Sequence, residues 1–348
     1  MAGTVFIADD PNLAEVLKSV VSGLEADGWR ILRGPPSAGP GIPFRFDAET
    51  RARYLPDADI AVVSSRSRIV PEDLDAAPRL RGLVFPSIGV DAVDLAACAK
   101  RGIIVGHGPI AENFVAMSEA TVMLILDLLY GLRRTEELFR TMQPRPARMH
   151  ARMLTGRTIG IIGMGRIGGG VVRRLAGWDA EILVNDPYIA PASVGDSAEP
   201  VSKEELLRRA DVVSLHVPLN DETRNIIGAA ELTTMKPGTF LGNTSRGGTV
   251  DEAALAEALE RGHLAGAALD VFDPEPPPAD HPLRGRDDVI LTPHMVGHTE
   301  DLYRAMPKAV LENIARIMAG DLPRYPKNPE IESAWRERLA RIAREGGA

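Results

Sequence analysis

A glycine-rich turn near the middle of the chain constrains the fold more than any other feature of the sequence. Gly163, Gly165 and Gly168 form a G-x-G-x-x-G motif in a chain of 348 residues. An apolar run at 159–162 leads directly into the motif, and a helical pattern follows it. Glycines in that context permit a tight turn, a close approach of the backbone to a pyrophosphate, and close helix–strand packing. Because a helix N-terminus also attracts phosphates, the motif predicts a dinucleotide site.

A carboxylate at the end of the next predicted strand bears on the choice of dinucleotide. The strand pattern at 181–185 ends at Asp186, twenty-one residues after Gly165. A carboxylate there accepts hydrogen bonds from the adenosine ribose and repels a 2′-phosphate, which favours NAD over NADP. Asp186 followed by Pro187 is also a common way to begin a turn. The strand, glycines, helix and spacing together favour the cofactor site.

Strand-like and helix-like segments alternate in two series, which predicts parallel sheets covered by helices on both faces. The first series has strand patterns at 4–8, 60–63, 82–85 and 103–105, with helical spacing at 11–26 and 95–100. The second has strand patterns at 158–162, 181–185, 212–217, 239–243, 266–270 and 289–292. Further helices are predicted at 118–138, as one long helix, at 301–319 and at 335–344. Residues 142–153 are rich in Pro, Arg and Met and show no periodicity.

The position of the glycine turn predicts how the two domains follow one another along the chain. It lies near the middle, so we expect one domain to interrupt the other rather than to follow it. The predicted fold class is α/β, with two doubly wound parallel-sheet domains: a Rossmann domain inserted in a flavodoxin-like domain. The expected Rossmann domain covers 108–299, and the split domain covers 1–107 and 300–348.

Composition argues against several other classes of protein. Hydrophobic residues make up 45% and charged residues 25%, which is usual for soluble globular chains. A net charge of -8 argues against nucleic acid or a membrane surface as a partner. The single Cys98 excludes an internal disulfide and fits a cytoplasmic location, and no metal site is expected. Asp127 interrupts the richest apolar run, and residues 1–10 lack a basic region, so neither a membrane helix nor a signal peptide is predicted.

Four motifs after the glycine turn carry a family resemblance. In order along the chain they are LHVPL at 215–219, NTSRGG at 243–248, LDVFDPEP at 269–276 and TPH at 292–294. Residues from about 60 to 308 thereby resemble the D-isomer-specific 2-hydroxyacid dehydrogenase family. The resemblance implies NAD-dependent hydride transfer between a small 2-hydroxy acid and its 2-oxo acid. It also implies a homodimer formed through the nucleotide-binding domain, with residues 142–153 as a candidate contact arm.

The resemblance implies a catalytic set of three side chains. Arg246 matches the arginine that binds the substrate carboxylate and carbonyl, Glu275 matches the partner of the histidine, and His294 matches the proton donor and acceptor. Imidazole exchanges protons near neutral pH, and a neighbouring carboxylate orients it and favours its charged form. A guanidinium can bind a carboxylate with two hydrogen bonds. Each of the three follows a predicted strand, at the sheet edge where α/β folds bind ligands.

The same resemblance assigns contacts to cofactor and substrate. The cofactor set is Gly163, Gly165, Arg166, Ile167, Gly168, Asp186, His216, Val217, Pro218, Thr223, Thr244, Ser245, Asp270, His294 and Gly297. The substrate set is Ser87, Ile88, Gly89, Arg246 and His294. Pro86 and Ser87 depart from the family pattern, which usually has glycine or another donor near here, and proline has no N–H to offer an anion. Arg66 and Arg68 lie near this loop, but Ser64 stands where the family usually has an arginine, which weakens a phosphoglycerate assignment.

Two other functions stay open on this scaffold. One is an NAD-sensing binding protein similar to transcriptional corepressors, and the other is an adenosylhomocysteinase-like enzyme with tightly held NAD. Taken singly, Arg246, Glu275 and His294 could each be ordinary loop residues. Their order within the matching motifs favours the dehydrogenase.

Overall fold

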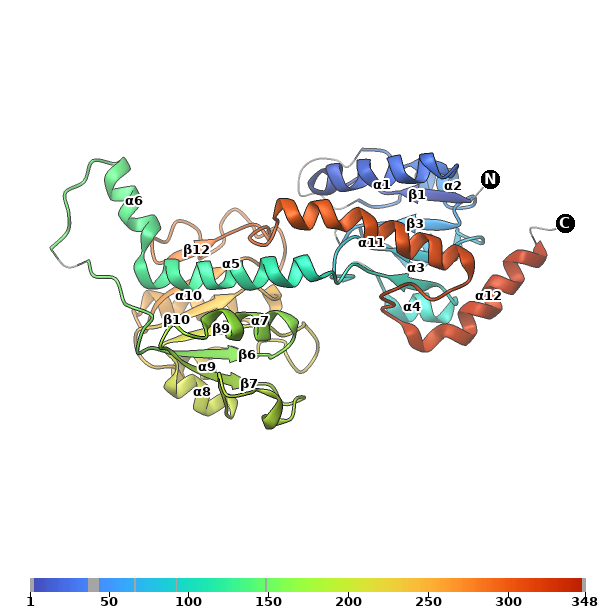
Figure 1. Cartoon of the computed structure of the whole chain (residues 1–348). Coiled ribbons are helices and arrows are strands. Elements are labelled where there is room, and N and C mark those ends of the chain that lie inside the picture. Colours follow the sequence, from blue (N-terminus) through green and yellow to red (C-terminus); the bar gives the residue numbers. More distant parts are fainter. Residues whose placement is uncertain (1–2, 37–43, 66, 92, 148, 346–348) are drawn as a thin grey trace. The chain divides into compact units, whose positions relative to one another are not determined.

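The computed structural model describes residues 3–36, 44–65, 67–91, 93–147 and 149–345. The chain forms two units, of which unit 1 contains the residues up to Glu112 and those from Thr299 onward. Unit 2 is the continuous segment Asn113–His298 (Figure 1). One unit is therefore inserted in the other.

Unit 1 is built on a five-stranded parallel sheet. Its strands are β1 (Thr4–Ile7), β2 (Arg30–Arg33), β3 (Ile60–Val62), β4 (Gly82–Val84) and β5 (Ile104–Gly106). They lie in the order β2-β1-β3-β4-β5, which is the flavodoxin-like order. The helices of the unit are α1 (Ala14–Ala26), α2 (Ala48–Tyr54), α3 (Pro71–Asp75), α4 (Leu95–Lys100), α11 (Glu300–Ala319) and α12 (Glu332–Glu345).

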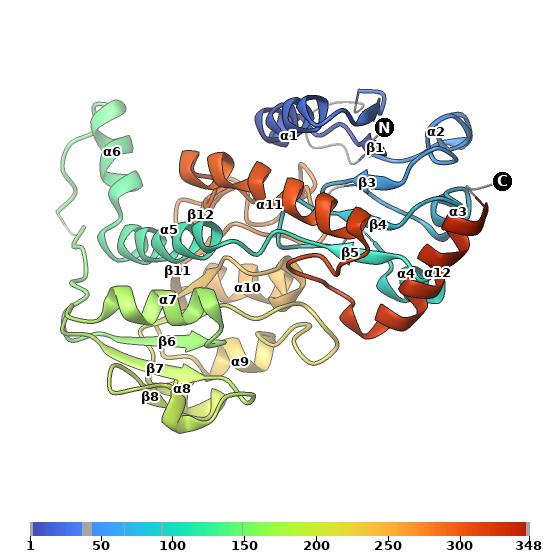
Figure 2. The same cartoon turned by 45° about the vertical axis from the view of Figure 1, so that its right-hand side comes forward.

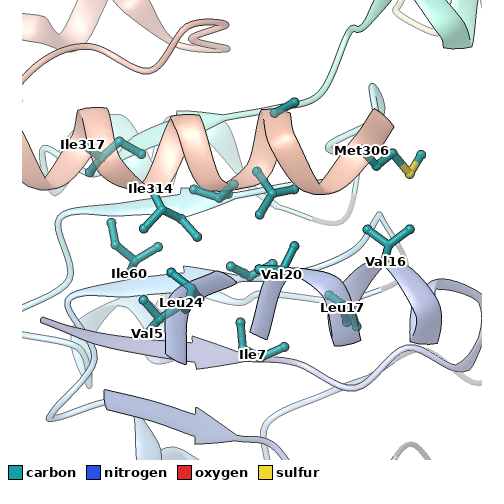
Figure 3. Close-up of a cluster of buried hydrophobic side chains, with 14 of the residues drawn as sticks. Val5, Ile7, Val16, Leu17, Val20, Leu24, Ile60, Met306, Ile314 and Ile317 are labelled. Carbon is teal, nitrogen blue, oxygen red and sulfur yellow. The ribbon is translucent and has the colours of Figure 1, made fainter. Parts of the chain in front are cut away.

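The two ends of the chain meet in the core of unit 1. Side chains alternate along a strand, so Val5 and Ile7 of β1 point to one face of the sheet. Figure 3 shows this face covered by α1 and α11, which come from opposite ends of the sequence. The apolar residues that α1 buries recur at helical spacing and include Val16, Val20 and Leu24. The C-terminal segment is therefore an integral part of this unit.

The only cysteine belongs to a second core cluster of unit 1, which packs on the face of the sheet that Phe6 of β1 points to. Cys98 on α4 is fully buried, and that burial raises the pKa of its thiol to about 12. A thiol with so high a pKa carries almost no thiolate near neutral pH, so Cys98 is unsuited to nucleophilic chemistry.

Unit 2 contains a seven-stranded parallel sheet. Its strands are β6 (Thr158–Ile162), β7 (Glu181–Asn185), β8 (Glu199–Pro200), β9 (Val212–Leu215), β10 (Thr239–Asn243), β11 (Leu264–Leu269) and β12 (Val289–Leu291). The order β12-β11-β10-β9-β6-β7-β8 is the Rossmann order with one further strand at the edge. Its helices are α5 (Ala111–Tyr130), α6 (Leu132–Arg140), α7 (Arg166–Leu175), α8 (Lys203–Arg209), α9 (Ala229–Thr234) and α10 (Glu252–Glu260). The predicted fold class, a Rossmann domain inserted in a flavodoxin-like domain, is confirmed.

Helix α5 alone is long and apolar enough, by length and composition, to be considered as a membrane span among the described residues. Its residues Ile125 and Leu129 pack in one cluster with Ile159 and Ile161 of β6, together with residues of α7. Leu124 contacts another part of the same sheet. The apolar character of α5 is therefore explained by its place in a protein core.

The prediction of one helix over 118–138 is wrong in two respects. The helix begins earlier, at Ala111, and it is broken at Gly131, where the backbone turns left-handed with φ 60°. Helix α6 then follows, and both views of the chain show it turning away from the body of unit 2 (Figure 2). Strands β2 and β8 were not predicted, because their side chains are exposed or half-buried and lack an apolar pattern.

Candidate active site

The three glycines of the motif meet different physical requirements. Gly163 has φ 94°, and a Cβ added there would lie 2.7 Å from the carbonyl oxygen of His216. A Cβ at Gly168 would lie 2.0 Å from the Gly163 carbonyl oxygen. A Cβ at Gly165 would meet nothing within 4 Å. Gly163 and Gly168 thus allow the turn itself, whereas Gly165 leaves open space beside the backbone.

That open space lies at the start of α7. Gly165 is the residue before the helix, no side chain caps its first N–H groups, and its first turn carries no acidic residue. A helix start of this kind presents N–H donors and a positive dipole end to an anion. The guanidinium of Arg166 lies over the Phe114 ring, 4.8 Å from its centroid, and the Ile167 carbonyl accepts from Ser118 Oγ at 3.2 Å.

Asp186 is held against the glycine turn. One carboxylate oxygen accepts from the backbone N–H of Met164 at 2.8 Å, and the other accepts from that of Tyr188 at 3.0 Å. These bonds fix a negative charge at the end of β7, beside the strand that leads into the motif. An open backbone, a positive helix end and a fixed acceptor fit a dinucleotide with unphosphorylated ribose.

The segment after β9 contains several residues predicted to contact the cofactor. Burial lowers the pKa of His216 to about 4, so its ring is neutral near pH 7. Its Nε2 lies 3.0 Å from Ser214 Oγ. Thr223 closes the turn that begins after Val217, because its hydroxyl donates to the Pro218 carbonyl at 2.6 Å. The contacts of these residues with a cofactor stay predictions.

Arg246 lies on a turn that a buried asparagine organises. Asn243, at the end of β10, accepts through Oδ1 from the N–H and hydroxyl of Ser245 at 3.0 and 2.8 Å. Its Nδ2 donates to the Arg246 carbonyl at 2.8 Å. Thr244 reaches α5 through a hydroxyl pair with Thr121, 3.1 Å apart. Sequence reasoning did not assign Asn243 a role, although a polar residue at the end of a buried strand was the available signal.

Asp270 organises the turn that carries the histidine. This fully buried residue at the end of β11 accepts through Oδ1 from Thr292 Oγ1 at 2.7 Å and from Met295 N at 2.9 Å. Burial raises the pKa of its carboxyl group, and the hydrogen bonds oppose that shift by favouring the charged form. Asp270 was predicted to lie near the nicotinamide, which stays a prediction. The sequence did not predict that Asp270 holds the turn carrying His294 through these hydrogen bonds.

The structure brings Glu275 and His294 together. Ring Nδ1 of His294 lies 2.9 and 3.1 Å from the two carboxylate oxygens of Glu275. In the part of the chain that the structure describes, Nε2 has no protein hydrogen-bond partner. The backbone of His294 is left-handed with φ 56°, a conformation that non-glycine residues rarely adopt outside functional turns. The pair leaves one ring nitrogen available for proton transfer.

These side chains share one edge of the unit 2 sheet. Arg246, Glu275 and His294 follow β10, β11 and β12 respectively, and these strands are neighbours. Because the strands are parallel, the three segments leave the sheet at the same edge. Gly297, the last predicted cofactor residue, packs against α5: a Cβ there would lie 2.1 Å from Met117 Sδ.

The predicted substrate loop lies in unit 1 and is held through its carbonyl groups. The Ser87 carbonyl accepts from Gly108 N at 2.9 Å, that of Ile88 lies 2.8 Å from His107 Nδ1, and that of Gly89 accepts from Ser87 Oγ at 3.0 Å. Within the described residues, the N–H groups of Ser87, Ile88 and Gly89 make no hydrogen bond. Three successive N–H groups suit a carboxylate. Arg66, predicted near this loop, lies outside the described residues.

Comparison with known proteins identifies the family. The sequence profile of the "D-isomer specific 2-hydroxyacid dehydrogenase, NAD binding domain" matches residues 122–296. A glyoxylate reductase of Thermofilum pendens is 36% identical over 289 residues, which cover 81% of this chain and 85% of the relative. The chain belongs to the D-isomer-specific 2-hydroxyacid dehydrogenase family, as the motifs indicated, and its cofactor is NAD.

Two further relatives show how far the likeness extends. A D-3-phosphoglycerate dehydrogenase of Methanocaldococcus jannaschii is 38% identical over 271 residues, 77% of this chain. The chain spans about half the length of that relative (51%). A D-lactate dehydrogenase from Aquifex aeolicus, solved with NAD and lactic acid, has a TM-score of 0.78 and 28% identity over 91% of this chain and 96% of its own. The fold is thus shared almost throughout.

Proposed function

We propose that the protein is an NAD-dependent D-2-hydroxyacid dehydrogenase that interconverts a small 2-hydroxy acid and its 2-oxo acid. The observation that carries the proposal is the pairing of His294 Nδ1 with Glu275, on the same sheet edge as Arg246. Support comes from the family and from relatives named as dehydrogenases and reductases.

The roles of the three side chains follow from their chemistry. When bound, NADH supplies the hydride for the substrate carbonyl carbon. His294, oriented by Glu275, gives a proton from Nε2 to the carbonyl oxygen during reduction and takes it back during oxidation. Arg246 binds the carboxylate and stabilises the negative charge that develops on the oxygen. The N–H groups of Ser87, Ile88 and Gly89 supply further carboxylate donors.

The test is turnover of a panel of 2-oxo acids. Purified protein with NADH is mixed with glyoxylate, pyruvate, hydroxypyruvate and longer or phosphorylated 2-oxo acids, and loss of NADH absorbance is followed. We expect turnover of at least one acid. Absence of turnover across the panel would contradict the proposal. NAD binding without turnover, with NAD-dependent assembly, would favour the corepressor-like function. Tightly held NAD that does not exchange would favour the adenosylhomocysteinase-like enzyme.

The preference for NAD is expected to depend on Asp186. Substituting Asp186→Ala removes the acceptor for ribose hydroxyls and the repulsion of a 2′-phosphate. Loss of about 1.4 kcal/mol in the binding free energy weakens NADH binding about tenfold, and the preference over NADPH shrinks. Asp186→Asn is the matched variant, since its amide oxygen keeps one of the backbone hydrogen bonds. Dissociation constants from NADH and NADPH fluorescence check this. An unchanged preference in both variants would show that Asp186 does not select the cofactor.

An apolar surface on α5, α6 and the following connector supports a homodimer. Within this surface Phe139 is 87% and Met142 is 92% exposed, and α6 buries none of its residues. The other large apolar residues of the surface are Val115, Met123, Tyr130, Leu132 and Met153. Large exposed apolar residues that recur along successive elements indicate an interaction site, and a second copy of the chain is the occupant we propose. Helix α6 also carries both arginines and glutamates, which a two-fold related copy can pair.

Light scattering coupled to size-exclusion chromatography tests the dimer. We expect twice the chain mass of 37.5 kDa for the protein, and a shift towards the monomer mass for the double variant Phe139→Asp, Met142→Asp. Tyr188→Ser, a change at an exposed aromatic residue that follows β7 and hydrogen-bonds Glu222, is the control and should remain dimeric. A monomer for the unaltered protein would contradict the proposal.

We also propose a cytoplasmic location.

A further inference from the structure

A second histidine–carboxylate pair contacts the loop that carries Glu275, and unlike the pair of Glu275 and His294 it is buried. His281 Nε2 is 2.6 Å from Glu252 Oε2, and the side chains are only 7% and 11% exposed. His281 also meets the Phe272 ring edge-on, with ring centroids 5.7 Å apart. Burial raises the pKa of the Glu252 carboxyl group, and the hydrogen bond from His281 opposes this shift. The proposed reaction gives neither residue a role.

The pair is connected to Glu275 through the backbone. The other oxygen of Glu252, Oε1, accepts from the backbone N–H of Asp273 at 2.9 Å. Asp273 is two residues before Glu275 in the sequence. Glu252 is the first residue of α10, so the pair joins this loop to a regular element of the fold.

The far side of the loop is held as well. Arg284 donates to the carbonyls of Pro277 and Pro278, both at 2.9 Å. The His281 N–H donates to the Pro278 carbonyl at 3.2 Å. The loop is therefore bound by Glu252 before Glu275 and by Arg284 after it.

Glu275 itself depends on this support. Its side chain is 34% exposed, and within the described residues its carboxylate hydrogen-bonds only to His294. Since no other side chain among the described residues fixes its position, the backbone of the loop must do so. A displacement of about 1 Å at a reacting group can lower a rate about 100-fold.

We propose that Glu252 and His281 are positioning residues that hold the loop so that Glu275 reaches His294 Nδ1. The inference rests on the proposed function, because it assigns the pair an effect only through Glu275. Buried charged pairs often add little stability, because desolvating them offsets their attraction. A role in fixing one loop geometry accounts for a pair at this place.

The test is a double-mutant cycle between Glu252 and Glu275. Glu252→Ala removes the acceptor for Asp273 N, and kcat should fall about tenfold, a barrier increase of about 1.4 kcal/mol. The KM for NADH should stay unchanged, and the pH profile of kcat should shift in the same direction as in Glu275→Gln. In the double variant, adding Glu252→Ala to Glu275→Gln should lower kcat little further. Both substitutions act through the same contact, between Glu275 and His294. Glu252→Gln, whose amide oxygen can still accept from Asp273 N, should restore most of the rate.

Controls separate positioning from general loss of stability. His263→Ala removes a histidine of the same unit that hydrogen-bonds the Leu232 and Met235 carbonyls, so it should lower Tm without changing kcat or the pH profile. If Glu252→Ala does not fold, His281→Asn carries the same comparison. Independent, additive losses in the double variant, or a lowered Tm with unchanged kcat and pH profile, would overturn the inference. If kcat is unchanged in Glu275→Gln, the proposed function fails and the inference fails with it. If Glu275→Gln loses activity but Glu252→Ala does not, only the inference fails.

Discussion

Substituting His294→Gln is expected to lower kcat by about 10²–10⁴-fold, the usual contribution of a general acid–base residue. Glutamine keeps a polar side chain near Glu275, but it cannot exchange a proton near neutral pH. The carbonyl oxygen would then take its proton from water, which the protein does not position. Steady-state kinetics with the best 2-oxo acid of the panel measure the change, and NADH fluorescence shows whether cofactor binding is retained.

The matched control for His294 is His263→Gln, in the same unit but hydrogen-bonded to the backbone carbonyls of Leu232 and Met235 at the end of α9. This control should keep its kcat. If both variants retain full activity, His294 is not the proton donor. If both lose activity equally, the loss reflects damage to the fold of unit 2 rather than to the reaction.

Substituting Arg246→Lys is expected to lower kcat/KM by about 10²–10³-fold although the charge is kept. A guanidinium offers two parallel hydrogen bonds to a carboxylate, whereas an ammonium is a point charge on a flexible chain. The backbone of the turn should persist, because Asn243 and Thr249 bind the Arg246 carbonyl rather than its side chain. The kinetics should show a raised KM for the 2-oxo acid together with a lowered kcat.

A second variant of the same residue separates charge recognition from folding. Arg246→Ala should recover part of its activity when guanidinium ion is added, since the ion can occupy the space of the lost side chain. Arg261→Lys is the control and should behave as the unaltered protein. Arg261 is an exposed arginine that directly follows α10 and pairs with Glu257 of that helix. If Arg246→Lys were as active as the unaltered protein, the assigned role of Arg246 would be wrong.

Many of the strands and helices could be predicted from apolar patterns in the sequence. The strands β6, β9 and β10 are almost wholly buried and mostly apolar, as expected for strands covered on both faces. Edge strands β2 and β8 have no such pattern, because only part of their surface is buried. The break between α5 and α6 was missed for another reason: a single glycine within an apolar pattern does not show whether its backbone turns left-handed.

The candidate site was predicted where its residues follow strands within recognisable motifs. The pair of Glu275 and His294 is an example, since each follows a strand at the same sheet edge. The supporting residues were not predicted, because their contacts join distant parts of the chain. Glu252 lies 21 residues from Asp273 and 29 from His281 in sequence. From sequence alone, a glutamate in a first helical turn is explained by the helix dipole.

The most direct test of the central claim follows the hydride itself. NADH that carries deuterium at both C4 positions of the nicotinamide is incubated with the best 2-oxo acid, and the product is examined by mass spectrometry and chiral chromatography. The account predicts the D-2-hydroxy acid with deuterium at C2 from the unaltered protein, and almost none from His294→Gln in the same time. A product without deuterium at C2, or the L-enantiomer, would contradict it.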